Sequence, residues 1–528
     1  MRWDWEAAAR SLGAAPDRTF NAGAVPLESR RALVWRRADG SVREVPGPEL
    51  QSLGRRCATL LKDLGVRRGD RVAGLLGRRP ETFGLALGTW LLGAIYVPLF
   101  TAFRGEGLRL RLADSGSSVV VTDAENRRHL GEVEQRLGSI HVLVVGGGAA
   151  ADDHDFERLV ERADAAVGVA RTTLDEPSTL MYTSGTMGPP KGCVLPHRAI
   201  LNLWPYVKAC LALTPGELLF STADPGWSFG LFTTGLAPLT MAGSRLLYEG
   251  PFDAAGWWDT AREHSVRHLA SAPSGYRQLM AAGPEVVGSP RPPLRAATSA
   301  GEPLDPPIIE WFERELAVTI HDSYGLTELG MVIANQRTPG TPAPAPGSMG
   351  LPLPGFEVRL LDDRGDEARA GEVGRVAVRD NGYLLGSGYW GRDVEWQERL
   401  VDGWWVTEDL ARRDERGRYW YVSRRDDVIV SSGYNIGPFE VETALLEHPL
   451  VQDAAVVGEA DPANGTLVVA HVVLVGPPPP DLDDELRRWV RDRVGRHAAP
   501  RRVQVHESLP RTESGKVRRQ ALRRPPAN

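Results

Sequence analysis

Tyr-Thr-Ser-Gly-Thr-Met-Gly-Pro-Pro-Lys-Gly occupies residues 182–192 and is the most constrained stretch of this 528-residue chain. An apolar run at residues 179–181 precedes it, and a helix is predicted to begin near His197. Hydroxyl side chains, glycines that leave backbone N–H groups bare, and one lysine are together typical of a loop that holds phosphate. The loop is not of the GxxxxGK[ST] type, because its hydroxyls precede the lysine. A flexible surface turn is the alternative, and the constrained composition favours the phosphate loop.

Helix and strand patterns alternate before this loop. Helices are predicted at residues 51–64 and 82–92, and short strands at residues 71–76, 119–122 and 141–145. Such alternation predicts an α/β architecture, in which ligands bind at the ends of parallel strands.

A possible membrane span lies within the same region. Residues 82–103 carry no charge, and their length alone would allow a transmembrane helix. Gly93 interrupts the run, and residues 95–98 have the pattern of a short strand, so a buried helix followed by a buried strand is predicted instead. The first 13 residues predict a short amphipathic helix rather than a secretory signal. We therefore expect a soluble, cytoplasmic protein without a membrane span.

The second half of the chain has a different pattern of predicted elements. Residues 337–355 are rich in Pro and Gly and predict a long loop, and short strands at 357–361 and 374–378 predict a small β-barrel-like subdomain. A charged patch at 424–427 precedes a helix at 439–447, strands at 454–457 and 467–475, and a helix at 482–494. The prediction is a large N-terminal domain of α/β subdomains with the β-barrel-like subdomain (1–424) and a smaller, mobile α+β C-terminal domain (425–528).

The amino-acid composition excludes several classes of protein. The net charge of −6 argues against a nucleic-acid partner, and three cysteines without a CxxC pair exclude a disulfide scaffold and a structural zinc site. Four of the 62 basic residues are lysine, at positions 62, 191, 208 and 516. In a chain so biased toward arginine, a lysine can mark a place that needs a compact ammonium group. We single out Lys191 and Lys516, and attribute the other two to chance.

Seven segments together carry a family resemblance. The loop at 182–192 resembles the phosphate-binding loop of the adenylate-forming superfamily, which includes acyl-CoA synthetases, the adenylation domains of peptide synthetases and firefly luciferase. Six further matches follow in that family's order: residues 299–304 (adenine side), 322–328 (nucleotide and metal), 405–409 (ribose), 423–427 (hinge), 432–442 (pantetheine tunnel) and 510–517 (catalytic loop). Taken singly, some of these matches are weak evidence for the family, but seven matches in the family's order are specific. They span two thirds of the chain.

The resemblance implies ATP, Mg²⁺ and coenzyme A as cofactors. Adenylation joins a carboxylate to the α-phosphorus of ATP, so the site must supply positive charge and fixed donors. The implied catalytic residues are Lys516, which would meet the carboxylate and the α-phosphate, Thr327, which would donate to that phosphate, and Glu328, which would hold Mg²⁺. Arg425 and Asp426 are implied as the hinge. The implied nucleotide and coenzyme A contacts are Thr183, Ser184, Gly185, Thr186, Gly188, Lys191, Gly301, Glu302, Pro303, Asp322, Ser323, Tyr324, Asp409, Arg424, Gly433 and Tyr434.

The likeness is greatest to short- and medium-chain acyl-CoA synthetases. It implies an acyl pocket near Trp227, Phe229, Gly325 and Met331, which we expect to be apolar, and no acidic residue stands where amino-acid-activating relatives place one to hold an α-amine. Acetate-selective relatives carry tryptophan where this chain has Gly325, so we expect glycine to leave that volume open for acids longer than acetate. The chain departs from the family pattern at Met187, Glu408, Ser423 and Asn435.

Three functions are compatible with these residues. The first is an ATP-dependent carboxylic acid–CoA ligase of the AMP-forming type, with a small uncharged acid as substrate. The second is an adenylating enzyme that passes the acyl group to a carrier protein or an amine, or adenylates an unusual acid. The third is a non-catalytic nucleotide-binding relative, against which the intact Glu328, Asp409 and Lys516 argue. The sequence leaves the acid and the oligomeric state open.

Overall fold

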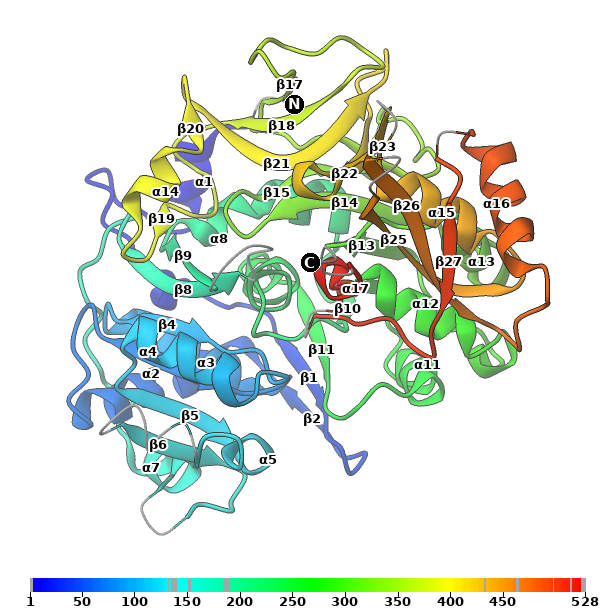
Figure 1. Cartoon of the computed structure of the whole chain (residues 1–528). Helices are drawn as coiled ribbons and strands as arrows, with labels where there is room; N and C mark the ends of the chain where they lie inside the picture. The colour runs from blue at the N-terminus through cyan, green and yellow to red at the C-terminus, as the bar shows by residue number, and fades with distance from the viewer. Residues whose placement is uncertain are drawn as a thin grey trace.

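A computed structural model of the chain describes residues 3–131, 133, 140–150, 153–183, 190–431, 434–461, 465–496, 498–512 and 515–523. Within these residues two large sheets with flanking helices form the N-terminal part, and a smaller α+β unit follows (Figure 1). The mixed α/β class predicted from the sequence is confirmed.

The first sheet carries the ends of the phosphate loop. Its strands β3, β4, β5, β6 and β8 are parallel neighbours, and β9 returns antiparallel beside β8, so that Thr183 and Lys191 face each other across the ladder. In spatial order the strands are β19 (Gly388–Tyr389), β9 (Lys191–Pro196), β8 (Pro177–Thr183), β4 (Ile95–Pro98), β3 (Arg71–Leu75), β5 (Val119–Asp123), β6 (His141–Val145) and β7 (His154–Asp155).

The second sheet combines a parallel and an antiparallel half. From β1 through β11, β10, β12 and β13 to β14 the pairs are parallel, and from β14 through β22 to β17 they are antiparallel. In order the strands are β17 (Val358–Leu361), β18 (Val373–Arg379), β21 (Trp404–Arg413), β22 (Tyr419–Arg424), β16 (Ser348–Pro352), β15 (Gly330–Ala334), β14 (Ile320–Leu326), β13 (Ala296–Ala300), β12 (His268–Ser271), β10 (Leu218–Ser221), β11 (Ser244–Tyr248), β1 (Leu33–Arg36) and β2 (Val42–Val45), and β20 (Leu400–Val401) pairs with β21.

Two helices of the N-terminal part, α2 and α3, pack closely against each other. A Cβ added at Gly88 of α3 would lie 2.6 Å from the carbonyl oxygen of Gly54 in α2, so glycine is required for the backbones of the two helices to meet. The helices of this part are α1 (Trp5–Ser11), α2 (Gly47–Asp63), α3 (Pro80–Leu91), α4 (Gly105–Ser115), α5 (Ala124–Arg127), α7 (Phe156–Arg162), α8 (Ala199–Asn202), α9 (Trp204–Tyr206), α10 (Ala237–Leu239), α11 (Ala254–Glu263), α12 (Pro273–Ala281), α13 (Pro306–Leu316) and α14 (Asp393–Gln397), with the shorter or wider turns η1 (Ala22–Ala24), η2 (Val207–Leu211), η3 (Phe229–Leu236) and η4 (Glu285–Val287).

The C-terminal unit has a hydrophobic core of its own, built around Val441, Val456, Val472 and Leu486. Figure 1 shows it in orange and red on the side of α12 and α13. It consists of η5 (Arg425–Asp427), β23 (Ile429–Ser431), β24 (Tyr434–Ile436), α15 (Pro438–Leu446), β25 (Val451–Asp461), β26 (Gly465–Leu474), α16 (Leu482–Arg493), β27 (Arg502–Val505) and α17 (Arg519–Leu522). The domain boundary at 424/425 stays a prediction.

Most predicted elements are present, with one clear error. Residues 82–103 form α3 and β4, as predicted, and no helix among the described residues has the length and apolarity to cross a membrane. The loop predicted at 337–355 is wrong at its end, because β16 (Ser348–Pro352) pairs with β15 and β22. Gly350 within it has φ +97°, and a Cβ there would lie 2.2 Å from Ala334 backbone atoms, so the glycine that suggested a loop is required by a close strand contact.

Candidate active site

One cavity of about 880 Å³ lies where the two sheets and the C-terminal unit meet. Loops that follow β10, β12, β13 and β14 form much of its wall, as expected for the carboxyl ends of parallel strands. Of the site residues predicted from the sequence, the wall includes Thr183, Lys191, Trp227, Phe229, Gly301, Glu302, Gly325, Thr327, Glu328, Met331, Asp409, Arg424, Asp426 and Lys516. Residues more than 300 positions apart therefore face one space.

The two ends of the phosphate loop line the cavity. Thr183 ends β8 and Lys191 begins β9, and the Thr183 hydroxyl donates to the Lys191 carbonyl oxygen at 3.4 Å. The Lys191 ammonium forms an ion pair with Glu395 and lies 5.4 Å from the centre of the Tyr389 ring. Ser184, Gly185, Thr186 and Gly188, together with Met187, lie outside the described residues.

Glu328 is a buried carboxylate whose position is fixed from two directions. The Tyr389 hydroxyl donates to Glu328 Oε1 at 2.7 Å, and the Gly386 N–H donates to the Glu328 carbonyl oxygen at 2.8 Å. Burial raises the pKa of Glu328, and the hydrogen bond from Tyr389 opposes that shift. Tyr389 was not predicted from the sequence, because only the pairing of β19 with β9 brings it to Glu328.

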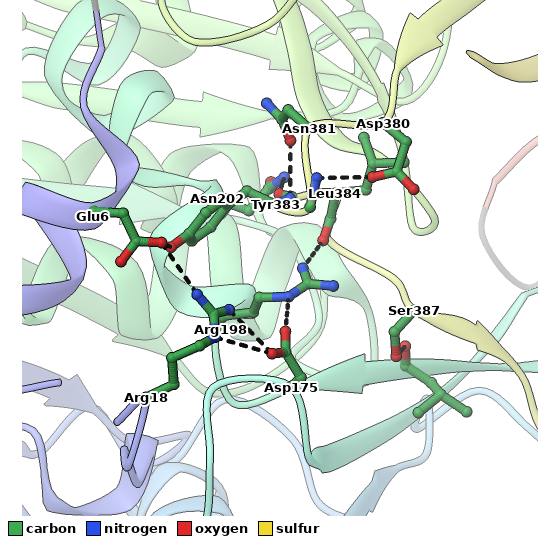
Figure 2. Close-up of polar contacts among 12 residues, drawn as sticks. Glu6, Arg18, Asp175, Arg198, Asn202, Asp380, Asn381, Tyr383, Leu384 and Ser387 are labelled. Atoms are coloured by element: carbon green, nitrogen blue, oxygen red, sulfur yellow. Dashed lines mark hydrogen bonds and ion pairs between the residues drawn. The ribbon is translucent and has the colours of Figure 1, made fainter. Parts of the chain in front are cut away.

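A polar network fixes the loop that carries Gly386 and leads to Tyr389 (Figure 2). Arg198 donates from Nη1 to the Leu384 carbonyl oxygen and from Nε to Asp175 Oδ1 at 2.9 Å. Tyr383 donates to Glu6 Oε1 at 2.8 Å, and its carbonyl oxygen accepts from the Asn202 side chain at 2.7 Å. The N-terminal helix α1 is therefore connected to the segment that positions Glu328, although its sequence shows no sign of this.

Asp409 of β21 is the second buried carboxylate of the site. Tyr324 donates to its Oδ2 at 2.7 Å, and the Asp409 N–H donates to the Thr407 hydroxyl at 3.0 Å. Burial raises its pKa, while the positive charges of Arg424 and Lys516 act in the opposite direction. Arg424 is opposite Asp409 in the ladder of β21 and β22, and its Nε donates to Asp426 Oδ1 at 2.9 Å.

The remaining predicted nucleotide contacts divide into two groups. Gly301 and Glu302 line the cavity, and Glu302 Oε2 accepts from Arg277 at 3.0 Å. Pro303, Asp322, Ser323 and Tyr324 are not part of the wall that the described residues form. Asp322 and Ser323 are buried within β14, because both faces of this central strand are covered, and Tyr324 reaches the site through Asp409.

Lys516 reaches the cavity from the C-terminal unit. Its loop is closed by Thr512, whose N–H donates to the Lys516 carbonyl oxygen at 2.6 Å and whose hydroxyl accepts from the Lys516 N–H at 3.1 Å. A Cβ added at Gly515 would lie 3.3 Å from the Ser274 hydroxyl oxygen, so this loop packs against α12. Arg425 and Asp426, the predicted hinge residues, lie in η5. Gly433 and the Tyr434 side chain lie outside what the structure describes.

Two expectations for the acyl pocket need correction. Gly325 lines the cavity, but a Cβ there would lie 2.2 Å from the Gly330 carbonyl oxygen, so its backbone contact fills the direction in which a side chain would point. The pocket is also not wholly apolar. Asp224 and Arg78 are half-buried in the cavity wall, and Asp224 Oδ2 accepts from Thr101 at 2.6 Å and Oδ1 from the Gly226 N–H at 2.7 Å. The pattern of apolar residues in a sequence indicates which segments are buried, but it does not show which polar side chains are buried with them to form hydrogen bonds in a turn.

Comparison with known proteins supplies the context for this site. The family model described as AMP-binding enzyme matches residues 24–390, and the AMP-binding enzyme C-terminal domain matches residues 440–516. The acetyl-coenzyme A synthetase of Bacillus subtilis (strain 168) is 34% identical over 483 residues, covering 90% of this chain and 84% of that protein.

Two solved structures resemble the whole chain. An acyl-CoA synthetase of Brucella canis shares 36% identity with a TM-score of 0.78, over 99% of this chain and 97% of the other. The anthranilate CoA ligase AuaEII, in complex with anthranoyl-AMP, shares 26% identity with a TM-score of 0.87, over 96% and 97% of the two chains.

Proposed function

Because this chain belongs to the AMP-binding enzyme family, we propose that it is an ATP-dependent carboxylic acid–CoA ligase that works through an acyl-adenylate and releases AMP and pyrophosphate. One observation carries the proposal: Lys516 of the C-terminal unit lines the same cavity as Thr327, Glu328 and Asp409 of the N-terminal part. These are the charge and the donors that an encounter between two anions requires.

The first half-reaction assigns a task to each of these groups. The Lys516 ammonium would lie between the acid carboxylate and the α-phosphate, so that the two anions can approach, and the Thr327 hydroxyl would donate to an α-phosphate oxygen. Asp409 would accept from the ribose hydroxyls, with its second oxygen held by Tyr324, and Arg424 would add a donor. Thr183 and Lys191, with the loop between them, would bind the outer phosphates.

Glu328 fits a role in holding Mg²⁺. The described residues contain no group of three His, Cys, Asp or Glu side chains that could bind a metal alone. A single buried carboxylate beside a phosphate loop suits Mg²⁺, which is bound through one or two carboxylates with phosphate oxygens and water. Bound there, Mg²⁺ would neutralise phosphate charge, and the hydrogen bond from Tyr389 to Oε1 would hold the Glu328 carboxylate that binds it in place.

The second half-reaction would need a different orientation of the C-terminal unit. We propose residues 1–424 and 425–528 as the two domains, with the pivot at Arg425 and Asp426, and Gly433 and Tyr434 beside the path of the coenzyme A thiol. An acyl carrier protein is the alternative acceptor. The substrate we propose is a small uncharged carboxylic acid, aliphatic or aryl. The cytoplasmic location stays a prediction.

Acid-dependent exchange of labelled pyrophosphate into ATP tests the first half-reaction. The purified chain should support exchange with some members of a panel of aliphatic and aryl acids, and no exchange with any acid would contradict the proposal. Adding coenzyme A or a phosphopantetheinylated carrier protein to the best acid then identifies the acceptor, by formation of acyl-CoA or acyl-carrier. A chain that binds ATP without exchange would instead be a nucleotide-binding relative.

A further inference from the structure

An ion pair inside the cavity has no role in the function proposed above. Arg399 follows α14, and Glu408 lies beside Asp409 in β21. Arg399 Nη1 donates to Glu408 Oε1, and both residues line the cavity. Their side chains are 33% and 29% exposed, so solvent and ligands reach both. Salt bridges exposed to this degree contribute little free energy, and a stronger anion can replace the carboxylate at small cost.

Arg399 lines the same cavity as Lys191 and Glu328, the groups proposed to bind the polyphosphate and its Mg²⁺. Trp396, whose carbonyl oxygen accepts from the Arg399 N–H, packs against Tyr389 with ring centres 5.3 Å apart, and Tyr389 donates to Glu328. ATP bound by these groups would therefore occupy the same cavity as the Arg399 guanidinium. Lys191 is paired with Glu395, which is not part of the cavity wall, whereas Arg399 is paired with a carboxylate that is.

The backbone holds Arg399 in place from both sides. Its N–H donates to the Trp396 carbonyl oxygen at 3.1 Å, and its own carbonyl oxygen accepts from the Val406 N–H at 2.8 Å. Trp396 is buried against Trp405, with ring centres 5.5 Å apart. Only the side chain is therefore left to move. Within the described part of the chain, one of the five N–H donors of the Arg399 guanidinium is bonded to Glu408. The planar guanidinium can bind phosphate oxygens in pairs.

We propose that Arg399 is a further phosphate-binding residue, which leaves Glu408 to bind the β- or γ-phosphate of ATP and the pyrophosphate product. Glu408 holds the guanidinium in the empty site and gives it up when the polyphosphate arrives. This inference rests on the proposed function, because it assumes that ATP occupies the cavity.

Binding of ATP and of AMP separates this role from others, because AMP lacks the two outer phosphates. Isothermal titration calorimetry of Arg399→Gln should show ATP binding weakened about tenfold, with AMP binding within twofold of the unchanged protein. The loss for ATP should be present both with Mg²⁺ and in EDTA, since the contact is with phosphate. Arg399→Lys should recover part of the affinity, and Glu408→Gln, which removes the competing carboxylate, should bind ATP about threefold more tightly.

Arg392→Gln is the matched control. Arg392 belongs to the same segment and lies 3.8 Å from Glu395 and from Asp114, but it is not part of the cavity wall. We expect unchanged affinities for ATP and AMP. Equal losses for ATP and AMP in Arg399→Gln, no loss for ATP, or a loss seen only with Mg²⁺ would each overturn the inference.

The proposed function can fail independently of this inference. A chain that binds ATP but shows no acid-dependent pyrophosphate exchange would contradict the ligase activity, while the comparison of ATP with AMP would still decide the role of Arg399. Circular dichroism of each variant checks the fold, and Glu408→Gln provides a second test that does not alter Arg399 itself.

Discussion

Replacing Tyr389 with phenylalanine removes one hydroxyl group from the environment of Glu328. Tyr389 is 7% exposed and Glu328 9%, and the lost bond is a 2.7 Å contact from a hydroxyl to a carboxylate. Buried hydrogen bonds to charged groups are worth about 1.5–3 kcal/mol, which corresponds to roughly 10–150-fold in an equilibrium constant. If Glu328 holds Mg²⁺, this factor should appear as a higher Mg²⁺ concentration for half-maximal activity.

Pyrophosphate exchange measured against Mg²⁺ concentration at several pH values is the assay. The hydrogen bond from Tyr389 lowers the pKa of Glu328, so its removal lets burial raise that pKa further. Mg²⁺ needs the ionised carboxylate, and the low-pH limit of activity should therefore move to higher pH in Tyr389→Phe. Direct calorimetric titration of the ATP-bound protein with Mg²⁺ should show the same weakening without any turnover.

Tyr419→Phe is the matched control for this prediction. Tyr419 is 1% exposed and donates to the Val358 carbonyl oxygen at 2.9 Å, outside the cavity. It should lower stability without changing the Mg²⁺ dependence or the pH limit. If Tyr389→Phe changes only stability, as the control does, or if its Mg²⁺ dependence equals that of the unchanged protein, the assignment of Glu328 as a Mg²⁺ ligand oriented by Tyr389 is refuted.

Three further predictions concern the acid and the two half-reactions. Lys516→Ala should slow acyl-adenylate formation roughly 10²–10⁴-fold, about 3–5 kcal/mol, while thioester formation from ready-made acyl-adenylate changes much less; equal losses in both steps would contradict its role. Asp426→Pro fixes φ and removes an N–H in η5, so it should hold the orientation seen here, in which Lys516 lines the cavity, and retain adenylation while losing thioester synthesis; normal rates of both would argue against the hinge. Trp227→Ala should open space beside Phe100, and at about 0.8 kcal/mol per buried methylene, three extra carbons shift the preference by roughly 2.4 kcal/mol, near sixtyfold. The ratio of kcat/KM for hexanoate over propionate measures that shift, and an unchanged ratio would exclude Trp227 from the acyl pocket.

The sequence predicts those parts of the fold in which local pattern and burial agree. The uncharged run at 82–103 becomes α3 and β4 because both elements are buried, and Gly93 separates them with φ +68°. The strand Ser348–Pro352 escaped prediction because its glycine and proline are typical of loops when the partner strand is not known. Close contact between two backbones is a tertiary fact that composition alone does not reveal.

The site residues also divide into those that a local sequence pattern predicts and those that depend on tertiary contacts. Lys516, Glu328 and Asp409 could be predicted to share one site because each lies in a short motif that resembles a motif of the adenylate-forming superfamily, and all three line the cavity. Tyr389 could not, because the pairing of β19 with the distant strand β9 brings it near Glu328. Arg399 could not, because its contact with Glu408 depends on the pairing of β20 with β21, which was not predicted from the sequence. For Gly325, the sequence shows that a side chain is absent, but it does not show that the Gly330 carbonyl group occupies the space that a side chain would fill.

The three cysteines have a practical consequence for testing whether the C-terminal unit moves, as proposed above. Cys57, Cys193 and Cys210 all lie in the N-terminal part, each is buried, and burial raises the pKa of each thiol. Thiol reagents act on the exposed thiolate, so all three should react slowly in the folded protein. A cysteine introduced on the exposed face of α16 and another on α4 would then be the fast-reacting positions. Fluorescent dyes could be attached there without removing any natural cysteine, and energy transfer between them would show whether the proposed reorientation takes place during turnover.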